Sequence, residues 1–430
     1  MLKSICRRVL RNPRLWLVWV LGPAAAAAQF GPTLEAGELA DAVAEVNAAG
    51  VAAAARAEAF DRAARAEGLW PDPQLMVEAS NLPAEEMTFD RTPMSGWQLY
   101  LRQTIPLPGK NTYRRRAAEG GAGAAAADAE AVRLRLVERA KYAYLDLYLA
   151  SALREITAQQ LAWWSDYERI ALARYAAGRG LQADVLNAQL ERTRPRAELL
   201  KLERRAAAAR GRVNVLLNRE PEAELPPLAG LPEVVVPYSR EELVAKALAS
   251  HPSLRAAEER MASAEAGRSL AKLSYVPDVT AGVGYRLRAE VPMDPVAGED
   301  FWSFSAGVSL PLVGTVKRGR EAARAEAAVR AAEASRTDAR NEVLWQLEDL
   351  AAAVATAEEE IPLYEEGILP QAEAAARSTL AAYEAGKVDF ASVLRTRLAL
   401  YRFEKEYVEL QVRRHQAIAS LEALVGERFY

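Results

Sequence analysis

The sequence contains very little of the chemistry that enzymes and metal sites use. Its 430 residues include one cysteine, Cys6, and two histidines, His251 and His415. Neither histidine lies near paired carboxylates at the spacing of metal ligands, so both are interpreted as ordinary surface or packing residues. There is also no phosphate-binding loop and no nucleophile elbow. The sequence therefore predicts a protein that is not an enzyme and that uses no metal or cofactor.

Long apolar runs are scarce as well. After residue 28 no stretch of 18 residues is apolar throughout, which argues against a membrane-spanning helix. The first 28 residues combine five cations, the short apolar run 15–21 and an A-x-A site at 26–28, a pattern typical of a cleaved signal peptide. A retained membrane anchor is the alternative, but this run is shorter than the roughly 20 residues that span a bilayer.

Export changes what the composition implies. Cys6 leaves with the signal, so a chain that begins near Gln29 has no disulfide and no thiol. The formal net charge shifts from −3 to −8 because five cations and no carboxylates are lost. A mildly acidic exported protein is a poor candidate for binding nucleic acid.

The chain repeats itself. Residues 175–187 (YAAGRGLQADVLN) align without gaps on residues 383–395 (YEAGKVDFASVLR), at an offset of 208. Two earlier landmarks repeat at offsets of 206 and 205: WPD at 70–72 with VPD at 276–278, and IPLPG at 105–109 with LPLVG at 310–314. Ordered landmarks at nearly constant offset indicate a duplicated unit. Two long copies favour a pseudo-symmetric ring rather than a solenoid.

Each copy has the same predicted order of elements: a helix, two strands, a very long helix, a tight turn and a second long helix. The predicted domains are a signal peptide at 1–28, a first repeat at 29–220, a Pro-rich linker at 221–238 and a second repeat at 239–430. In the first repeat we expect strands near 72–80 and 96–107, and long helices near 110–176 and 183–218. In the second we expect strands near 277–287 and 301–312, and long helices near 317–385 and 389–426.

The predicted strands alternate between apolar and small or polar side chains. In the clearest case the even-numbered residues from Trp302 to Leu310 are apolar, and the odd-numbered residues between them are Ser or Gly. A half-buried soluble strand shows the same pattern, but these strands approach the roughly 9–11 residues of a membrane-crossing strand, and aromatics such as Trp70, Trp97 and Tyr285 lie near their ends. Four strands cannot close a barrel, since single-chain barrels start at about eight. A lipid-facing sheet therefore requires several chains.

Proline is absent from 110 to 176, which predicts one helix about 100 Å long. Apolar residues in this helix and in the return helix step by 3 and 4, as in a coiled-coil seam. Alanine on the other faces lets neighbouring helices approach on both flanks, as the wall of a cylinder requires. Pro362 and Pro370 predict a bend or inserted turn in the second long helix, and Pro195 predicts a bend in the first return helix.

The motifs PDPQL at 71–75, QTIPLPGK at 103–110, ADVLNAQ at 183–189 and Y-x-x-G at both tips complete this pattern. With them the sequence resembles the TolC family of outer-membrane efflux proteins over essentially the whole chain after the signal. The resemblance implies a mainly α-helical homotrimer whose twelve strands form one transmembrane β-barrel in outer-membrane lipid. That barrel is continuous with a periplasmic tunnel of twelve coiled-coil helices, two tandem repeats per chain.

The resemblance also implies a role and partners. The implied function is a passive channel, docked through a periplasmic adaptor (membrane fusion) protein on an inner-membrane pump. The phrase around IPLPGK is closest to the heavy-metal branch, which works with resistance-nodulation-division pumps. Heavy-metal cations are therefore one expected cargo, and drugs or other small molecules are another.

Family members close the periplasmic mouth with hydrogen bonds between helix tips. One joins an aspartate after the first tip to the tyrosine of the second tip, and the matching positions are Asp184 and Tyr383. A second link uses an arginine where this chain has Val388, with Lys387 adjacent. We expect this second link to be reduced, or rebuilt around Lys387 or Arg179.

Many relatives also carry two aspartates that ring the tunnel entrance. The matching positions here are Ser392 and Arg395, with Asn187 at the first tip, so the resemblance does not extend to an acidic ring. The tip glycines, Gly178 and Gly386, need no family knowledge, because a helix that ends in a left-handed turn prefers glycine.

A periplasmic coiled-coil adaptor or structural protein is the main alternative to a channel. It would share the signal peptide and the heptads. It would not need four amphipathic strands with aromatic ends in two matched pairs. A requirement for detergent distinguishes the two hypotheses.

Overall fold

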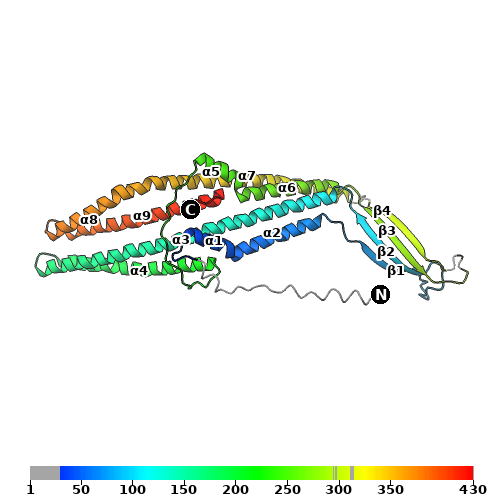
Figure 1. Cartoon of the computed structure of the whole chain (residues 1–430), viewed down its shortest axis with the longest axis horizontal. Helices are drawn as coiled ribbons and strands as arrows, with labels where there is room; N and C mark the ends of the chain where they lie inside the picture. The colour runs from blue at the N-terminus through cyan, green and yellow to red at the C-terminus, as the bar shows by residue number, and fades with distance from the viewer. Residues whose placement is uncertain (1–29, 294, 296–297, 310–313, 430) are drawn as a thin grey trace.

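The computed structural model describes residues 30–293, 295, 298–309 and 314–429. The predicted signal peptide at 1–28 and the predicted strand end around Leu310 lie outside these residues. The described chain is a long rod, with a four-stranded sheet at one end and two helical hairpin tips at the other (Figure 1). Among the described residues, no helix combines the length and apolarity needed to cross a membrane.

Equivalent elements follow one another in the two repeats. The first contains α1 (Ala36–Val46), α2 (Ala48–Glu67), β1 (Gln74–Ser80), β2 (Gly96–Ile105), α3 (Lys110–Ala176) and α4 (Gln182–Leu216). The second contains α5 (Arg240–Ser250), α6 (Pro252–Leu273), β3 (Val279–Arg288), β4 (Phe301–Val308), α7 (Thr315–Pro362), the π-helix η2 (Leu363–Ile368), α8 (Leu369–Glu384) and α9 (Phe390–Val425). The 67-residue α3 coincides with the proline-free stretch.

The strands form one antiparallel sheet in the order β1-β2-β3-β4, so the two repeats meet between β2 and β3. The register aligns apolar residues on one face: Leu99 pairs with Tyr285, and Tyr285 pairs with Trp302, whose ring centroid lies 4.8 Å away. On the same face Phe304 is 82% exposed and Trp302 is 65% exposed. Among the described strands, β1 and β4 each pair on one side only, which leaves backbone groups unpaired at both edges.

The opposite face of the sheet is polar and tightly fitted. A Cβ on Gly282 would lie 2.4 Å from the Tyr100 hydroxyl, and one on Gly284 would lie 2.6 Å from the Tyr100 ring. The two glycines therefore make room for this ring. Beside it, Arg286 donates a hydrogen bond of 3.0 Å to the Gln98 side chain. The alternation seen in the sequence thus separates an apolar face from a hydrogen-bonded one.

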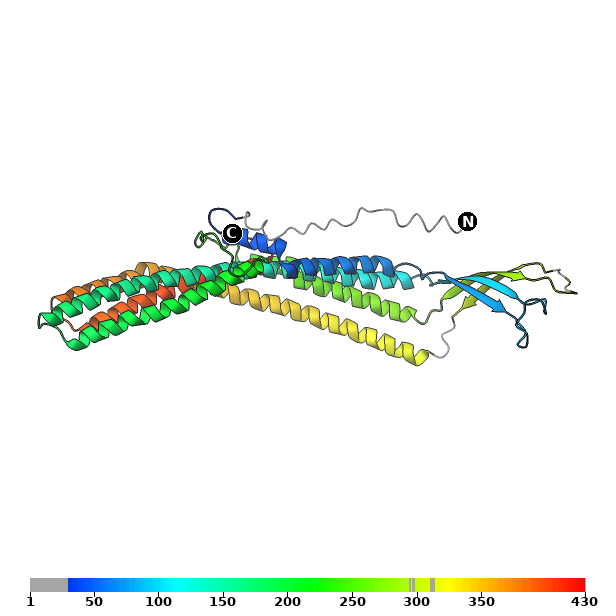
Figure 2. The same cartoon turned by 90° about the horizontal axis from the view of Figure 1, so that it is seen from below.

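The helices continue the sheet without changing its order. α2 leads into β1, β2 leads into α3, α6 leads into β3, and β4 leads towards α7. Contacts join α2 to α3, α3 to α6, and α6 to α7. Farther from the sheet, the α3–α4 hairpin and the hairpin of α8 and α9 run to the two tips (Figures 1 and 2).

The second long helix is not continuous. The helix predicted at 317–385 is divided into α7 and α8 by η2, which lies between Pro362 and Pro370. A π-turn accommodates the backbone groups that these prolines displace, so the predicted inserted turn is present. Pro195 is buried inside α4, which continues on both sides of it without an inserted turn.

The helix predicted at the start of each repeat is in fact two helices. The Asn47 side chain separates α1 from α2 and accepts a hydrogen bond of 2.9 Å from the Ala49 amide. Between α5 and α6 in the second repeat, His251 precedes Pro252, and its side chain accepts a hydrogen bond of 3.3 Å from the Ser253 amide. Both residues are therefore helix N-caps, and burial lowers the pKa of His251.

The Pro-rich segment 221–238 is packed against the rod. Leu34 and residue 228 form a parallel bridge, in which the Leu34 amide donates to the Pro227 carbonyl at 2.8 Å. The Tyr144 hydroxyl donates to the Gly230 carbonyl at 2.6 Å. At the same level the buried Lys141 of α3 forms an ion pair with Glu422 of α9, and burial lowers the pKa of Lys141. The middle of the rod therefore holds the repeats together.

Candidate functional site

The two hairpins end in turns of the same geometry. In the first tip Gly178 has φ of 70°, and its amide donates to the Tyr175 carbonyl at 2.9 Å. In the second tip Gly386 has φ of 73°, and its amide donates to the Tyr383 carbonyl at 2.9 Å. The next amide in each tip reaches back five residues, at 2.8 Å. This is the Schellman arrangement, whose left-handed residue explains glycine at both positions.

Tyr383 lies in an apolar cluster that spans both hairpins. The cluster contains Trp164, Tyr167 and Val185 of the first hairpin and Phe390 of the second. The rings of Tyr383 and Phe390 meet edge to face, with centroids 5.5 Å apart. Only 3% of Tyr383 is exposed. A tyrosine packed this closely needs a partner for its hydroxyl.

That partner is Asp184, in the first turn of α4. The Tyr383 hydroxyl donates to Asp184 Oδ2 at 3.3 Å, which joins the second hairpin to the first. Burial, followed by the nearby Asp184 charge, raises the pKa of Tyr383 to about 12. The hydroxyl therefore remains a donor throughout the physiological range. The negative Asp184 is also well placed at the positive end of α4.

Arg174, in the last turn of α3, makes a second connection between the hairpins. Its Nη1 donates to the Tyr383 carbonyl and, at 2.7 Å, to the Glu384 carbonyl, both at the end of α8. Its Nη2 donates to the Arg179 carbonyl at 3.2 Å, so one guanidinium caps both tips. The guanidinium also lies 4.6 Å from the centre of the Tyr383 ring. We call the contacts of Asp184, Tyr383 and Arg174 the tip latch.

The other candidate gate residue, Lys387, lies at the surface. Its side chain is exposed and has no hydrogen-bond or ion-pair partner among the residues that the structure describes. Arg179 is also exposed, and it joins the latch only through its backbone carbonyl. The cation that bridges the tips is thus neither of the two that the sequence singled out.

The entrance candidates are divided between the hairpins. Arg395 Nη2 donates to Ser392 Oγ at 3.3 Å, and Ser392 Oγ donates to Asp389 at 2.6 Å. The Ser392 amide also donates to Asp389, the N-cap of α9, and these hydrogen bonds lower the pKa of Asp389. Asn187 is exposed on α4, and among the described residues no hydrogen bond joins it to Ser392 or Arg395.

The sequence holds a partial signal for Arg174. It is the only basic residue in the last turn of α3, and it directly precedes Tyr175, the repeat counterpart of Tyr383. A cation at a helix end predicts capping of carbonyl groups. The sequence does not show that two of these carbonyls belong to the other hairpin. Among the described residues, no three His, Cys, Asp or Glu side chains gather as metal ligands.

We predict that Arg174→Ala loosens the second tip. Hydrogen bonds to charged groups contribute about 1.5–3 kcal/mol each, so local opening at residues 385–389 becomes easier. Hydrogen exchange of these amides, followed by mass spectrometry, should accelerate at least about tenfold. Lys387→Ala is the matched control, since it removes a cation of the same tip without removing a contact. Equal exchange rates in the two variants would show that Arg174 does not hold the tip.

Comparisons with known proteins bear on the family and the fold. A family model described as outer membrane efflux protein matches residues 40–219 and 243–427. Three similar solved structures are VceC of Vibrio cholerae, MtrE of Neisseria gonorrhoeae in its open state, and CusC. VceC is 22% identical and has a TM-score of 0.77, over 92% of this chain and 97% of that chain. MtrE is 18% identical and has a TM-score of 0.74, over 91% of this chain and 89% of that chain. CusC is 17% identical and has a TM-score of 0.79, over 91% of this chain and 92% of that chain.

At these identities the solved structures share the fold. A comparison with curated proteins gave no match. The family model, in contrast, covers most of both repeats, from α1 and α2 through the tips to the end of α9. Its members are outer-membrane transport channels rather than enzymes. The chain belongs to the outer membrane efflux protein family.

Proposed function

We propose that the chain is the outer-membrane channel subunit of a tripartite efflux system. It passively conducts substrates that an inner-membrane pump of the resistance-nodulation-division type delivers through a periplasmic adaptor. The observation that carries this proposal is the sheet: one exposed apolar face, a polar opposite face, and a helical layer in the same order as the strands. A coiled-coil adaptor needs the helices but not this sheet.

Three copies make a complete channel in this proposal. The unpaired edge of β4 in one copy pairs with the unpaired edge of β1 in the next, which gives twelve strands, above the roughly eight that close a barrel. The same operation places α7 beside α2 of the next copy, so twelve helices continue the barrel as a tunnel across the periplasm. The apolar face then meets outer-membrane lipid, and the polar face with Gln98, Tyr100 and Arg286 lines the lumen.

The tip latch is the periplasmic gate in this proposal. Asp184 and Tyr383 join the two hairpins of each copy, and Arg174 holds the end of α8 against the first tip. Asn187, Ser392 and Arg395 line the entrance, and Lys387 offers an exposed charge nearby. Because Arg395 occupies a position that is acidic in many relatives, the entrance does not concentrate cations by charge alone.

The proposed cargo is a heavy-metal cation, with drugs or other small solutes as the second possibility. Support comes from the QTIPLPGK phrase at 103–110, whereas CusC shares only the fold. The described residues hold no cluster of metal-ligating side chains.

The lipid-facing assignment predicts opposite outcomes for neighbouring residues of β4. Phe304→Arg places a charge on the apolar face, where it costs about 2–4 kcal/mol in a bilayer, so insertion into liposomes and discrete conductance steps in planar bilayers should be strongly reduced. Ser305→Arg, on the polar face, should retain both. If the sheet faces water instead, the 82% exposed Phe304 tolerates arginine and the protein stays monodisperse without detergent.

The gate assignment predicts more frequent opening in Tyr383→Phe. This change removes the hydroxyl donated to Asp184 but keeps the packed ring, and one hydrogen bond of about 1 kcal/mol corresponds to about fivefold. Open probability in planar bilayers should rise by at least that factor, because the variant lacks the contact in all three proposed copies. Tyr175→Phe is the matched control, because Tyr175 occupies the same repeat position and is 46% exposed. If the two variants conduct alike, the latch lies elsewhere.

The cargo proposal predicts a metal-sensitive phenotype. Deletion of the gene should lower growth tolerance to copper, zinc or cobalt by several-fold, because a pump without an outer channel cannot clear the periplasm. Tolerance to bile salts and drugs is measured in parallel. Unchanged tolerance to every metal removes the heavy-metal proposal and leaves the channel proposal intact.

A further inference from the structure

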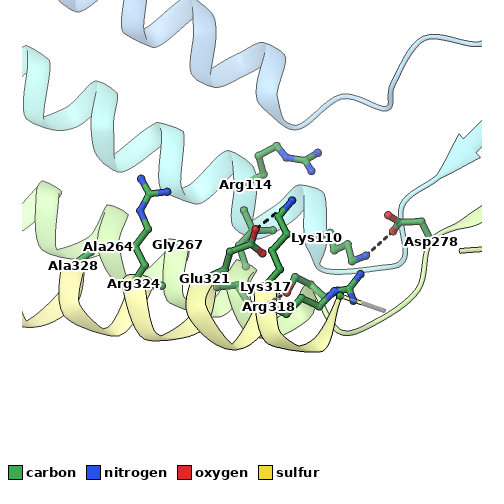
Figure 3. Close-up of a pocket in the computed structure, with 15 residues that line it drawn as sticks. Lys110, Arg114, Ala264, Gly267, Asp278, Lys317, Arg318, Glu321, Arg324 and Ala328 are labelled. Carbon is green, nitrogen blue, oxygen red and sulfur yellow. Dashed lines mark hydrogen bonds and ion pairs between the residues drawn. The ribbon is translucent and has the colours of Figure 1, made fainter. Parts of the chain in front are cut away.

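A basic pocket lies where the helices meet the sheet. It encloses about 590 Å³ between the start of α3, the end of α6 and the start of α7 (Figure 3). Five cations and two carboxylates line it: Lys110, Arg114, Lys317, Arg318, Arg324, Asp278 and Glu321. The remaining lining residues are mostly small, such as Ala264, Gly267 and Ala328, which leave the space open. The pocket therefore has an excess of positive charge.

Two of the cations stabilise the junction between the helices and the sheet. Lys110, with a side chain 11% exposed, forms an ion pair of 2.8 Å with Asp278 and donates to the Val276 carbonyl at 2.6 Å. Arg318 Nε donates to the Ser274 carbonyl at 2.9 Å, which ties α7 to the end of α6. These contacts fix the walls of the pocket and neutralise one of its two carboxylates.

Two of the remaining cations, Lys317 and Arg324, are available to a ligand. Lys317 and Glu321 are 3.9 Å apart and mostly exposed, a weak pair in water. Arg114 donates to Asn111 at 3.0 Å and lies 4.0 Å from Glu67, outside the pocket lining. Arg324 is exposed and has no hydrogen bond or ion pair with any residue of the described chain. The positive charge is thus only partly compensated.

The position of the pocket along the rod, between the sheet and the long helices, indicates the kind of ligand. Exposed apolar residues surround this junction: Leu69 and Trp70 precede β1, Tyr275 and Val276 precede β3, and Val316 begins α7. Trp and Tyr of this kind gather where a membrane meets water. In the proposed function, on which this step rests, the junction lies at the periplasmic surface of the outer membrane.

We infer that this pocket binds the phosphate of an anionic phospholipid headgroup from the periplasmic leaflet. Lysine and arginine donate charge-assisted hydrogen bonds to phosphate oxygens, and basic pockets between helices at a membrane surface bind such headgroups. The positive end of α7 adds to the attraction.

Native mass spectrometry of the full chain in detergent tests this inference, with phosphatidylglycerol and phosphatidylcholine as probes. The protein should bind phosphatidylglycerol at least about tenfold more tightly, since each cation near a membrane surface contributes several-fold. The double variant Lys317→Gln, Arg324→Gln should lose about tenfold of that affinity. The matched control Arg330→Gln, Arg336→Gln changes two exposed cations of α7 outside the pocket and should lose none.

Competition with inorganic phosphate identifies the source of the ligand. If the lipid is the ligand, millimolar phosphate does not displace phosphatidylglycerol; if phosphate alone binds as tightly, the lipid assignment is overturned. Equal losses in the two double variants, or no preference over phosphatidylcholine, also overturn it. The conductance of the wild-type preparation is recorded alongside. A conducting protein without lipid preference contradicts this inference alone, whereas a silent protein that still prefers phosphatidylglycerol contradicts the proposed function alone.

Discussion

The apolar face of the sheet is the constraint on which the rest of the structure depends. Trp97, Trp302 and Phe304 are 48%, 65% and 82% exposed on this face. Water is a poor solvent for such a patch, and an open edge at β1 and β4 invites pairing with another chain. Lipid on the face and further copies at the edges satisfy both requirements together. Each of α2, α3, α6 and α7 is joined directly to one strand. In the proposed trimer these helices therefore follow the order of the strands around the ring.

The repeats are joined at three levels of different strength. At the sheet, β2 and β3 share a full antiparallel register. In the middle, Lys141 and Glu422 form an ion pair with side chains 1% and 4% exposed, and leaving either charge buried alone costs about 3–5 kcal/mol. At the tips, a hydroxyl contact of 3.3 Å, the partly exposed Arg174 and the apolar cluster around Tyr383 join the two hairpins. Unlike the middle of the rod, the tips hold no buried ion pair among the described residues that their separation would break.

Much of this architecture could be predicted from the sequence, because its signals are periodic. Alternation of period two defined the strands and their apolar face, the absence of proline defined α3, and Tyr-x-x-Gly at equal offsets defined both tips.

The features that the sequence did not predict depend on contacts that local sequence patterns do not show. Asn47 and His251 divide the first helix of each repeat because their side chains cap the next helix, a choice the surrounding alanine-rich sequence does not show. Arg174 was missed because its acceptors lie 209 and 210 residues away in the chain. Pro195 lies inside α4, which continues on both sides of it, and the bend expected there stays a prediction.

In the proposed gate, few hydrogen bonds join the two tips of each copy, which limits the free energy that opening requires. Three latches, one per copy in the proposed trimer, contribute on the order of 2 kcal/mol each from a few hydrogen bonds. Together they approach the roughly 5.5 kcal/mol that moves a two-state equilibrium from nearly all closed to nearly all open. A docking partner can supply this amount at the tips without touching the buried ion pair. The π-helix η2 ends 15 residues before Tyr383, at the base of the α8–α9 hairpin that would move in the proposed gate. Such insertions are frequent at functional sites in helices. In the proposed channel, the tips can then separate while the strand register and the buried ion pair are kept.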